Sequence, residues 1–124
     1  MTKRLITLHA DDSLNIVSKT FEKHKFHHIP IIEHGKLAGI LSKTDLLRLL
    51  SVRDQYSEQA FKRIRARDFM TSNVITVRPD DTVGLAADMF LTNDLHALPV
   101  VDDGELVGIV TTHDLLKYAY AHPS

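Results

Sequence analysis

The sequence predicts a mixed α/β (α+β) fold in which two copies of one strand-helix-strand-strand-helix unit pack as a single module. The first observation is an internal repeat: residues 1–47 align with residues 70–116 at a separation of 69 residues (114 − 45), without a gap. Of these 47 positions, 16 are identical, whereas unrelated segments would match at roughly one position in sixteen. The second observation is that both copies place the same patterns in the same order. A repeat of this length indicates two supersecondary units that share a core.

Each copy opens with a short β-branched run, at residues 5–8 and 74–77, which is typical of a strand. Acidic and hydroxyl residues at 11–13 and 80–82 then supply N-cap side chains, so a helix is expected to begin there. The residues that follow share one helical face by their spacing, namely Leu14, Val17, Phe21 and His24 in the first copy and Val83, Ala86 and Phe90 in the second. These helices are expected to bury that face against a sheet.

The second half of each copy has the pattern of a β-hairpin followed by a helix. An apolar strand with proline near its start comes first, at residues 29–32 and 98–101. Gly35 and Gly104 mark tight turns, and return strands follow at 37–41 and 106–110. Ser42 and Thr111 are expected to end these strands, and helices are expected to begin at Asp45 and Asp114.

The boundaries that follow are a first repeat at residues 1–56, a helical charged connector at 57–67 and a second repeat at 68–124. The stretch between the copies, 49–69, carries many charges and no glycine or proline. A solvated helical surface is the preferred interpretation. Nucleic-acid binding through the basic residues from Lys62 to Arg67 is the weaker alternative.

Composition limits the classes of partner. The 124 residues carry a formal net charge of −1, a pI near 6.7 and no cysteine, so a polyanionic partner, a disulfide framework and a thiolate metal site are not expected. No apolar run approaches the roughly 20 residues that cross a bilayer. A cytoplasmic protein without a membrane or nucleic-acid partner is expected.

Several of these segments resemble the cystathionine-β-synthase (CBS) domain, and the tandem pair resembles a Bateman module. The matching pieces are the proline strands at 28–32 and 97–101, the glycine turns, the Gly-Ile-hydrophobic-Ser/Thr-x-x-Asp-Leu segments at 39–46 and 108–115, and the opening motif at 67–71. The resemblance implies pseudo-two-fold symmetry, two clefts between the copies, a homodimer, and AMP, ADP or ATP as ligand with no required cofactor. It also implies that the module regulates another protein, such as an enzyme or a transporter, and performs no chemistry itself.

The spacing of Ser42 and Asp45, repeated by Thr111 and Asp114, has two interpretations. It is the pattern of a capping box, which satisfies backbone donors and binds nothing. An aspartate at a helix start also accepts hydrogen bonds from both hydroxyls of a ribose, and the resemblance places the family's ribose-binding aspartate on Asp45 and Asp114. Spacing alone favours the capping box, the resemblance favours ribose, and both roles can coexist.

The resemblance further implies that each cleft combines this segment of one copy with the opening strand and proline strand of the other. The first site would be Ile40, Ser42, Thr44 and Asp45 with Thr76, Arg78, Leu95, His96 and Ala97. The second would be Ile109, Thr111, His113 and Asp114 with Thr7, His9, Phe26, His27 and His28. Only the first has a permanent cation, Arg78, so it is expected to bind the phosphorylated ligand more tightly.

Other functions are less well supported. A zinc site at His24, His27 and His28 is disfavoured because Pro30 follows too soon for a helix to stack them. No catalytic triad or glycine-rich phosphate loop is present, so neither an enzyme nor a metalloprotein is expected. A structural dimerisation module with degenerate, non-binding clefts remains the alternative. The homodimer is predicted from small and apolar helix residues expected to face outward: Ala86, Ala87 and Leu91.

Overall fold

The structure is a computed structural model that describes residues 5–93 and 95–121, so both extreme ends of the predicted repeats lie outside the described residues. The chain divides into two compact units, an N-terminal unit of residues 6–73 and a C-terminal unit that contains Leu5 and the residues from Val74 onward. Both units contain helices and a small sheet, which confirms the mixed α/β fold class. No helix within the described ranges has the length and apolar character needed to cross a bilayer.

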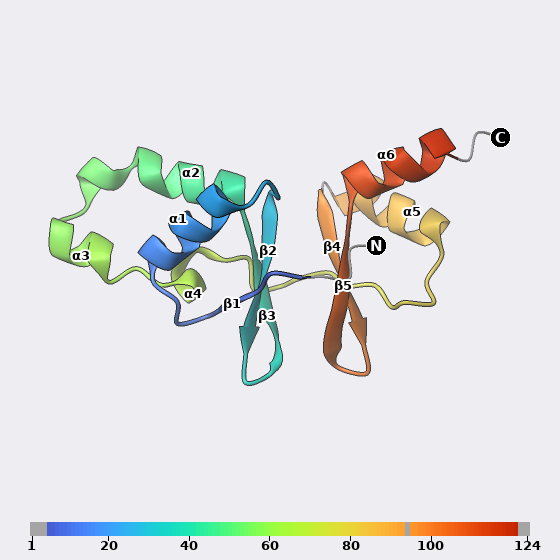
Figure 1. The fold of residues 1–124 in the computed structure, drawn as a ribbon, viewed down its shortest axis with the longest axis horizontal. Coiled ribbons are helices and arrows are strands. Elements are labelled where there is room, and N and C mark those ends of the chain that lie inside the picture. Colours follow the sequence, from blue (N-terminus) through green and yellow to red (C-terminus); the bar gives the residue numbers. More distant parts are fainter. Residues whose placement is uncertain (1–4, 94, 122–124) are drawn as a thin grey trace. The chain divides into compact units, whose positions relative to one another are not determined.

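The N-terminal unit is a three-stranded sheet with two helices on one side (Figure 1). The strand order is β1-β2-β3, with β1 parallel and β3 antiparallel to β2. Its elements in chain order are β1 (Leu8–His9), α1 (Leu14–Lys23), β2 (His28–Glu33), β3 (Lys36–Ser42) and α2 (Lys43–Ser51).

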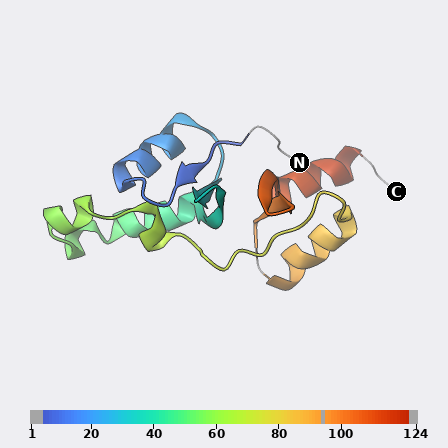
Figure 2. The same ribbon diagram turned by 90° about the horizontal axis from the view of Figure 1, so that it is seen from below.

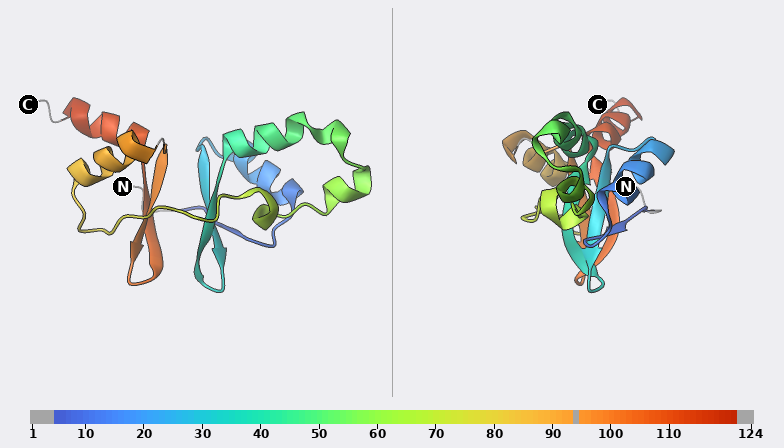
Figure 3. Two further views of the ribbon diagram at one scale, coloured as in Figure 1. Left: turned by 180° about the vertical axis from the view of Figure 1, so that it is seen from behind. Right: turned by 90° about the vertical axis from the view of Figure 1, so that its left-hand side faces the viewer.

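The C-terminal unit repeats this arrangement with a two-stranded antiparallel sheet (Figures 1 and 3). Helices α5 and α6 pack on one another and lie on the same side of the β4–β5 hairpin. Its elements are α5 (Val83–Asn93), β4 (Ala97–Asp102), β5 (Glu105–Thr111) and α6 (Thr112–Ala121).

Both hairpin turns form as the sequence predicts. His34 and Gly35 have φ values of 54° and 76°, and Asp103 and Gly104 have 52° and 83°. Two successive residues with positive φ make a type I′ turn, whose twist matches that of the flanking strands. The glycine supplies this conformation without a Cβ penalty.

The opening strands are shorter than predicted at 5–8 and 74–77. In the N-terminal unit only Leu8 and His9 pair with β2, opposite Ile31 and Ile32. In the C-terminal unit a single bridge joins Val77 to Val100. Continuing either ladder toward the N-terminus would bring it to the proline of the neighbouring strand, which has no N–H to donate.

The apolar face of α1 is confirmed. Ser13 caps the helix by accepting from the Ile16 amide at 3.3 Å, and Leu14, Val17 and Phe21 are 5%, 0% and 2% exposed.

The corresponding face of α5 is only partly buried. Ala86 and Phe90 are buried, but Val83 is 43% exposed. Because Ala86 belongs to the core of its own unit, it was wrongly counted among the outward residues that predicted a homodimer. Leu91, at 84% exposure, does face outward.

The connector is not one solvated helix. It contains a 3₁₀ turn (Arg53–Gln55), α3 (Glu58–Lys62) and α4 (Ala66–Phe69). Phe61 and Ala66 are 8% and 0% exposed and belong to the hydrophobic core of the N-terminal unit. Figure 2 shows α3 and α4 within that unit. The prediction of a purely solvated surface was therefore wrong for the apolar positions of this segment.

The side chain of Arg67 links α4 to other parts of the N-terminal unit. Its Nε donates to Oδ1 of Asp11 at 3.1 Å, and its guanidinium also contacts Glu33. The hydrogen bond from Arg67 lowers the pKa of Asp11 below its ordinary value of 3.8. A carboxyl whose pKa is lowered by folding stabilises the fold above its ordinary pKa, and that stabilisation is lost as pH falls through the lowered value.

We therefore expect the Arg67→Met variant to lose less stability than the parent when pH falls from about 5 to about 3. Urea denaturation at a series of pH values measures this slope. Identical slopes for the two proteins would contradict the assigned contact.

Gly39 allows the chain after α4 to approach β3. A Cβ at this position would meet Sδ of Met70 and the carbonyl oxygen of Thr71, each at 2.7 Å. The close approach is held by paired backbone bonds between Ile40 and Thr71, at 3.0 and 2.9 Å.

We expect Gly39→Ala to lower the free energy of unfolding by about 1–3 kcal/mol, the range typical of overpacking. Gly84→Ala is the matched control, because its Cβ would have no heavy atom nearer than 3.8 Å. That helical position is expected to gain about 0.5–1 kcal/mol. Chemical denaturation measures the free energy of unfolding of both variants. An equal change in the two variants would refute the packing argument.

Candidate functional site

The candidate site is built around the aspartate that follows each hairpin. Ser42 ends β3 and caps α2, and Thr111 ends β5 before α6. Each hydroxyl accepts from the backbone amide of its aspartate, at 3.0 Å for Asp45 and 3.1 Å for Asp114. Each aspartate returns the bond by accepting on Oδ2, at 3.0 and 2.9 Å. The capping box is therefore present in both copies.

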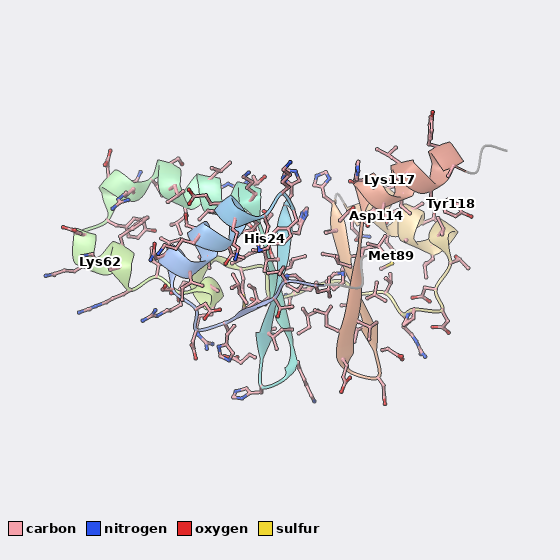
Figure 4. The ribbon with its side chains drawn as sticks, in the orientation of Figure 1. His24, Lys62, Met89, Asp114, Lys117 and Tyr118 are labelled. Carbon is pink, nitrogen blue, oxygen red and sulfur yellow. The ribbon has the colours of Figure 1, made fainter. Side chains whose placement is uncertain are left out.

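Capping uses only one oxygen of each carboxylate. Oδ1 of Asp45 lies 3.8 Å from the guanidinium of Arg48, whose side chain is 74% exposed. Oδ1 of Asp114 has no hydrogen bond to any residue that the structure describes. Figure 4 marks Asp114 at the beginning of α6, with Tyr118 one turn later. Each aspartate can thus cap its helix and still accept a hydrogen bond from a ligand.

The residues before each proline strand come close to the same helix start. The Lys43 amide donates to the His27 carbonyl at 2.8 Å, and the Thr112 amide donates to the His96 carbonyl at 3.1 Å. In the ladders, His28 stands opposite Ser42.

Ala97 stands opposite Thr111 in the same way. Within each unit, the structure therefore gathers the aspartate, its capping hydroxyl and the start of the proline strand from one and the same repeat.

The resemblance grouped these residues differently, because it combined the aspartate of one copy with the strands of the other. The predicted residues Thr44 and His113 lie on the first turns of α2 and α6 and are exposed. Thr7 and Thr76 are also exposed and lie within the opening segments, directly before Leu8 of β1 and before Val77, which bridges to Val100.

Phe26 and Leu95 have a structural role in addition to any binding role. Phe26 packs edge-to-face on Phe21 with ring centroids 6.2 Å apart, and His24 stacks on its other side at 4.9 Å. Leu95 packs against the core of the C-terminal unit.

His24 is thus engaged with an aromatic ring. Among the described residues, no three side chains of the metal-binding types gather into a possible cation site.

Arg78 and its counterpart His9 differ as the sequence suggests. Arg78 is 73% exposed, and its Nε lies 3.4 Å from Oδ1 of Asp80. Nδ1 of His9 accepts from the Asp11 amide at 3.0 Å. A protonated imidazole cannot accept on that nitrogen, so binding an anion through a charged His9 competes with this local bond.

A pocket of about 220 Å³ lies wholly within the C-terminal unit. Arg78 and Asp114, which the resemblance assigned to different sites, both line it. The remaining lining is mostly apolar and includes Val83, Leu115 and Tyr118, none of which was singled out as a site residue. The sequence pattern alone did not mark this pocket. It is recognised from the incomplete burial of the apolar face of α5, which is seen when the two units are compared.

The basic stretch at the end of the connector is partly engaged in ion pairs, although Arg63 and Arg65 are exposed and have no ion pair to a described residue. Lys62 lies 3.5 Å from Glu58, and Arg67 is paired with Asp11 and Glu33. These ion pairs weaken the nucleic-acid alternative, because phosphate binding would have to replace them.

Sequence and structure comparisons with known proteins find relatives that match nearly the whole chain. MJ1225, an uncharacterized protein of Methanocaldococcus jannaschii, is 32% identical to this chain over 130 residues. The match covers 95% of this chain but only 45% of that protein, so the chain spans less than half the length of this relative.

Two solved structures resemble the whole chain and contain adenosine compounds. One is the CBS domain pair of protein MJ0100 in complex with 5′-methylthioadenosine and S-adenosyl-L-methionine. It is 33% identical, with a TM-score of 0.83 and coverage of 98% of this chain and 92% of that one. The other is CBSX2 in complex with AMP, which is 29% identical, with the same TM-score and the same coverage.

The CBS domain family matches this chain twice, over residues 1–52 and 66–121. These two matches coincide with the two copies of the internal repeat. The chain belongs to the CBS domain family, as a tandem pair of CBS domains.

Proposed function

We propose that this chain is a regulatory module that binds an adenosine nucleotide and performs no chemistry itself. The proposal rests on the two oxygens of each aspartate. Oδ2 caps the helix, while Oδ1 makes no hydrogen bond to a described residue and can accept one from a ligand. A carboxylate oxygen so placed can accept from a ribose hydroxyl. The adenosine ligands of the two related structures support this choice of ligand class.

We assign the residues gathered in each unit to one half-site for the nucleoside. Asp114 would hold the ribose, Thr111 and the first amides of α6 would face a phosphate, and His96 and Ala97 would contact the base. A helix start favours a phosphate because it lies at the positive end of the dipole, and in α6 the His113 amide makes no hydrogen bond to a described residue, unlike the amides of Thr112 and Asp114. In the N-terminal unit, Asp45, Ser42, His27 and His28 would have the same roles.

Thermal denaturation with a series of ligands tests this proposal. AMP, ADP and ATP at 100 times their dissociation constants are expected to add about 2.7 kcal/mol of stability. For a domain of this size, that corresponds to a shift of several degrees in melting temperature. Adenine alone is expected to give much less, because it lacks the ribose. If no adenosine compound shifts the transition, S-adenosyl-L-methionine included, the proposal fails.

Arg78 is proposed to distinguish the two sites by binding phosphate. A charge-assisted hydrogen bond contributes roughly 1.5–3 kcal/mol. We expect Arg78→Ala to weaken binding of AMP by about tenfold while leaving binding of adenosine unchanged. Calorimetry with the two ligands measures this difference. An equal loss for both would mean that Arg78 does not contact phosphate.

The alternative is a structural dimerisation module whose clefts bind no ligand. Its support is the apolar surface on the outer helices, where Leu91 and Leu116 are 84% and 70% exposed and Tyr120 is 90% exposed. A homodimer that buries these side chains is compatible with either function. Analytical ultracentrifugation tests the dimer, and only a dimer that binds none of the nucleotides would favour the alternative.

A further inference from the structure

The turn that follows the opening segment is built alike in the two units. The His9 amide donates to Oδ2 of Asp12 at 2.8 Å, and the Asp12 amide donates back to the His9 carbonyl at 2.9 Å. Arg78 and Asp81 repeat both bonds, at 2.7 and 3.0 Å. His9 and Arg78 therefore project from the same kind of turn, and the chemical difference between the two turns lies in these side chains.

In the N-terminal unit, the ring of His9 is held by the backbone of its own turn. The Asp11 amide donates to Nδ1 at 3.0 Å. Because Nδ1 needs a free lone pair to accept this bond, the bond selects the neutral tautomer that carries its proton on Nε2. Nε2 makes no hydrogen bond to a described residue, and the side chain is 52% exposed. The ring of His9 thus offers one uncharged N–H donor to a ligand.

The peptide group that orients this ring is itself held from the other side by the connector. In a trans peptide, the carbonyl and the N–H point in opposite directions. The carbonyl of Ala10 accepts from the Arg67 amide at 2.9 Å, and the N–H of the same peptide group, on Asp11, faces His9. Ala10 is fully buried. The backbone of α4 therefore fixes the peptide group that fixes the tautomer.

The carboxylate of Asp11 is engaged by Arg67 and not by the histidine. Its Oδ1 accepts from Nε of Arg67 at 3.1 Å, whereas its Oδ2 lies 3.9 Å from Nδ1 of His9, beyond hydrogen-bond distance. In the C-terminal unit the counterpart Asp80 has its Oδ1 3.4 Å from Nε of Arg78. One turn therefore carries a permanent cation beside an acid, and the other carries a neutral donor.

We propose that His9 binds a ligand as an uncharged donor through Nε2, so that the N-terminal unit accepts an unphosphorylated nucleoside such as adenosine as readily as AMP. This inference rests on the proposed binding of adenosine compounds. A neutral N–H donates to a hydroxyl oxygen or a ring nitrogen without requiring a charge on the ligand. The guanidinium of Arg78 instead makes charge-assisted bonds, which are roughly twice as strong with an anionic acceptor. A preference for phosphate is therefore expected at Arg78 and not at His9.

NMR spectroscopy of the imidazole rings tests the tautomer without any ligand. Long-range ¹H–¹⁵N correlation spectra at about pH 8, where a histidine of ordinary pKa is uncharged, show which nitrogen of each ring carries the proton. His9 is expected to be protonated on Nε2 alone. His34, an exposed residue of the first hairpin turn whose ring has no hydrogen bond to a described residue, is expected to show exchange between both tautomers. The same exchange at His9 would overturn the proposal.

Titrations followed at the Asp11 amide resonance test the ligand class at this turn. The parent chain is expected to bind adenosine and AMP there with affinities within about threefold of each other. His9→Leu is expected to weaken adenosine binding by about fivefold, and His9→Gln, which restores a neutral N–H donor, to recover most of that loss. His9→Arg is expected to shift the preference toward AMP by about tenfold. His34→Leu is the control and should change neither affinity.

The outcomes separate this inference from the proposed function. AMP binding that is more than about tenfold tighter than adenosine binding at this turn, or equal adenosine affinity in His9→Leu and the parent, would overturn the role of His9 and leave nucleotide binding intact. If neither adenosine nor AMP shifted a resonance in either unit, the proposed function would fail, and the inference about His9 would fail with it.

Discussion

Replacing Phe61 by alanine is expected to lower the free energy of unfolding by about 3 kcal/mol. The phenyl ring is 8% exposed within the core of the N-terminal unit and packs edge-to-face on Tyr56, with ring centroids 6.2 Å apart. Removing it deletes buried apolar area and leaves a cavity in the groove between α1 and α2. Urea denaturation measures the loss.

Tyr120→Ala is the control for this prediction. Tyr120 is also an aromatic residue but is 90% exposed on α6, so its removal is expected to change stability by less than about 0.5 kcal/mol. If Phe61→Ala changed the free energy of unfolding as little as Tyr120→Ala, the connector would not belong to the core of the N-terminal unit.

Changing both Asp45 and Asp114 to asparagine is expected to remove most of the stabilisation by AMP, about 2.7 kcal/mol at 100 times the dissociation constant. Asparagine keeps a side-chain oxygen that can continue to cap each helix, so the free protein should lose less than about 1 kcal/mol. The change removes the negative charge that makes the carboxylate a strong acceptor for ribose hydroxyls.

Asp88→Asn is the matched control for the double variant, because Asp88 is an exposed aspartate on α5 that belongs to neither proposed half-site. It should leave the AMP-induced shift intact. A shift that also survives in the Asp45→Asn, Asp114→Asn protein would show that these residues only cap helices.

Much of the fold could be predicted because its signals are local. Gly35 and Gly104 specify turns that need positive φ, and the spacing of Leu14, Val17 and Phe21 specifies a buried helix face. The extent of the opening strands could not be predicted in the same way. The extent of the first opening strand depends on which of its residues lies opposite Pro30 in the neighbouring strand. That pairing is a tertiary contact.

The role of the connector was missed for a related reason. Phe61 and Ala66 are five residues apart in a charged stretch, on two different short helices, so no single helical period connects them. Their burial accompanies backbone bonds that join Ile64, Ala66 and Arg67 to Leu14, Asp12 and Ala10, which lie 50 to 57 positions earlier in the sequence. A pattern read along the chain contains no information on such a contact.

The candidate site was predictable to a different degree. The capping box at Ser42 and Asp45 follows from spacing and is present. Spacing could not decide whether the same carboxylate also binds a ribose, because both roles require an aspartate at a helix start. The grouping of His96 with Asp114 in one unit needed the backbone bond from Thr112, which the sequence does not reveal.

Isothermal titration calorimetry with AMP and with 2′,3′-dideoxy-AMP tests the central claim most directly, because the two ligands differ only in the hydroxyls that Asp45 and Asp114 are proposed to hold. The account predicts saturable binding of AMP and binding of the dideoxy analogue that is weaker by at least about tenfold. Equal affinity for the two ligands would contradict the assignment of the aspartates to ribose, and absence of heat with either would contradict nucleotide binding itself.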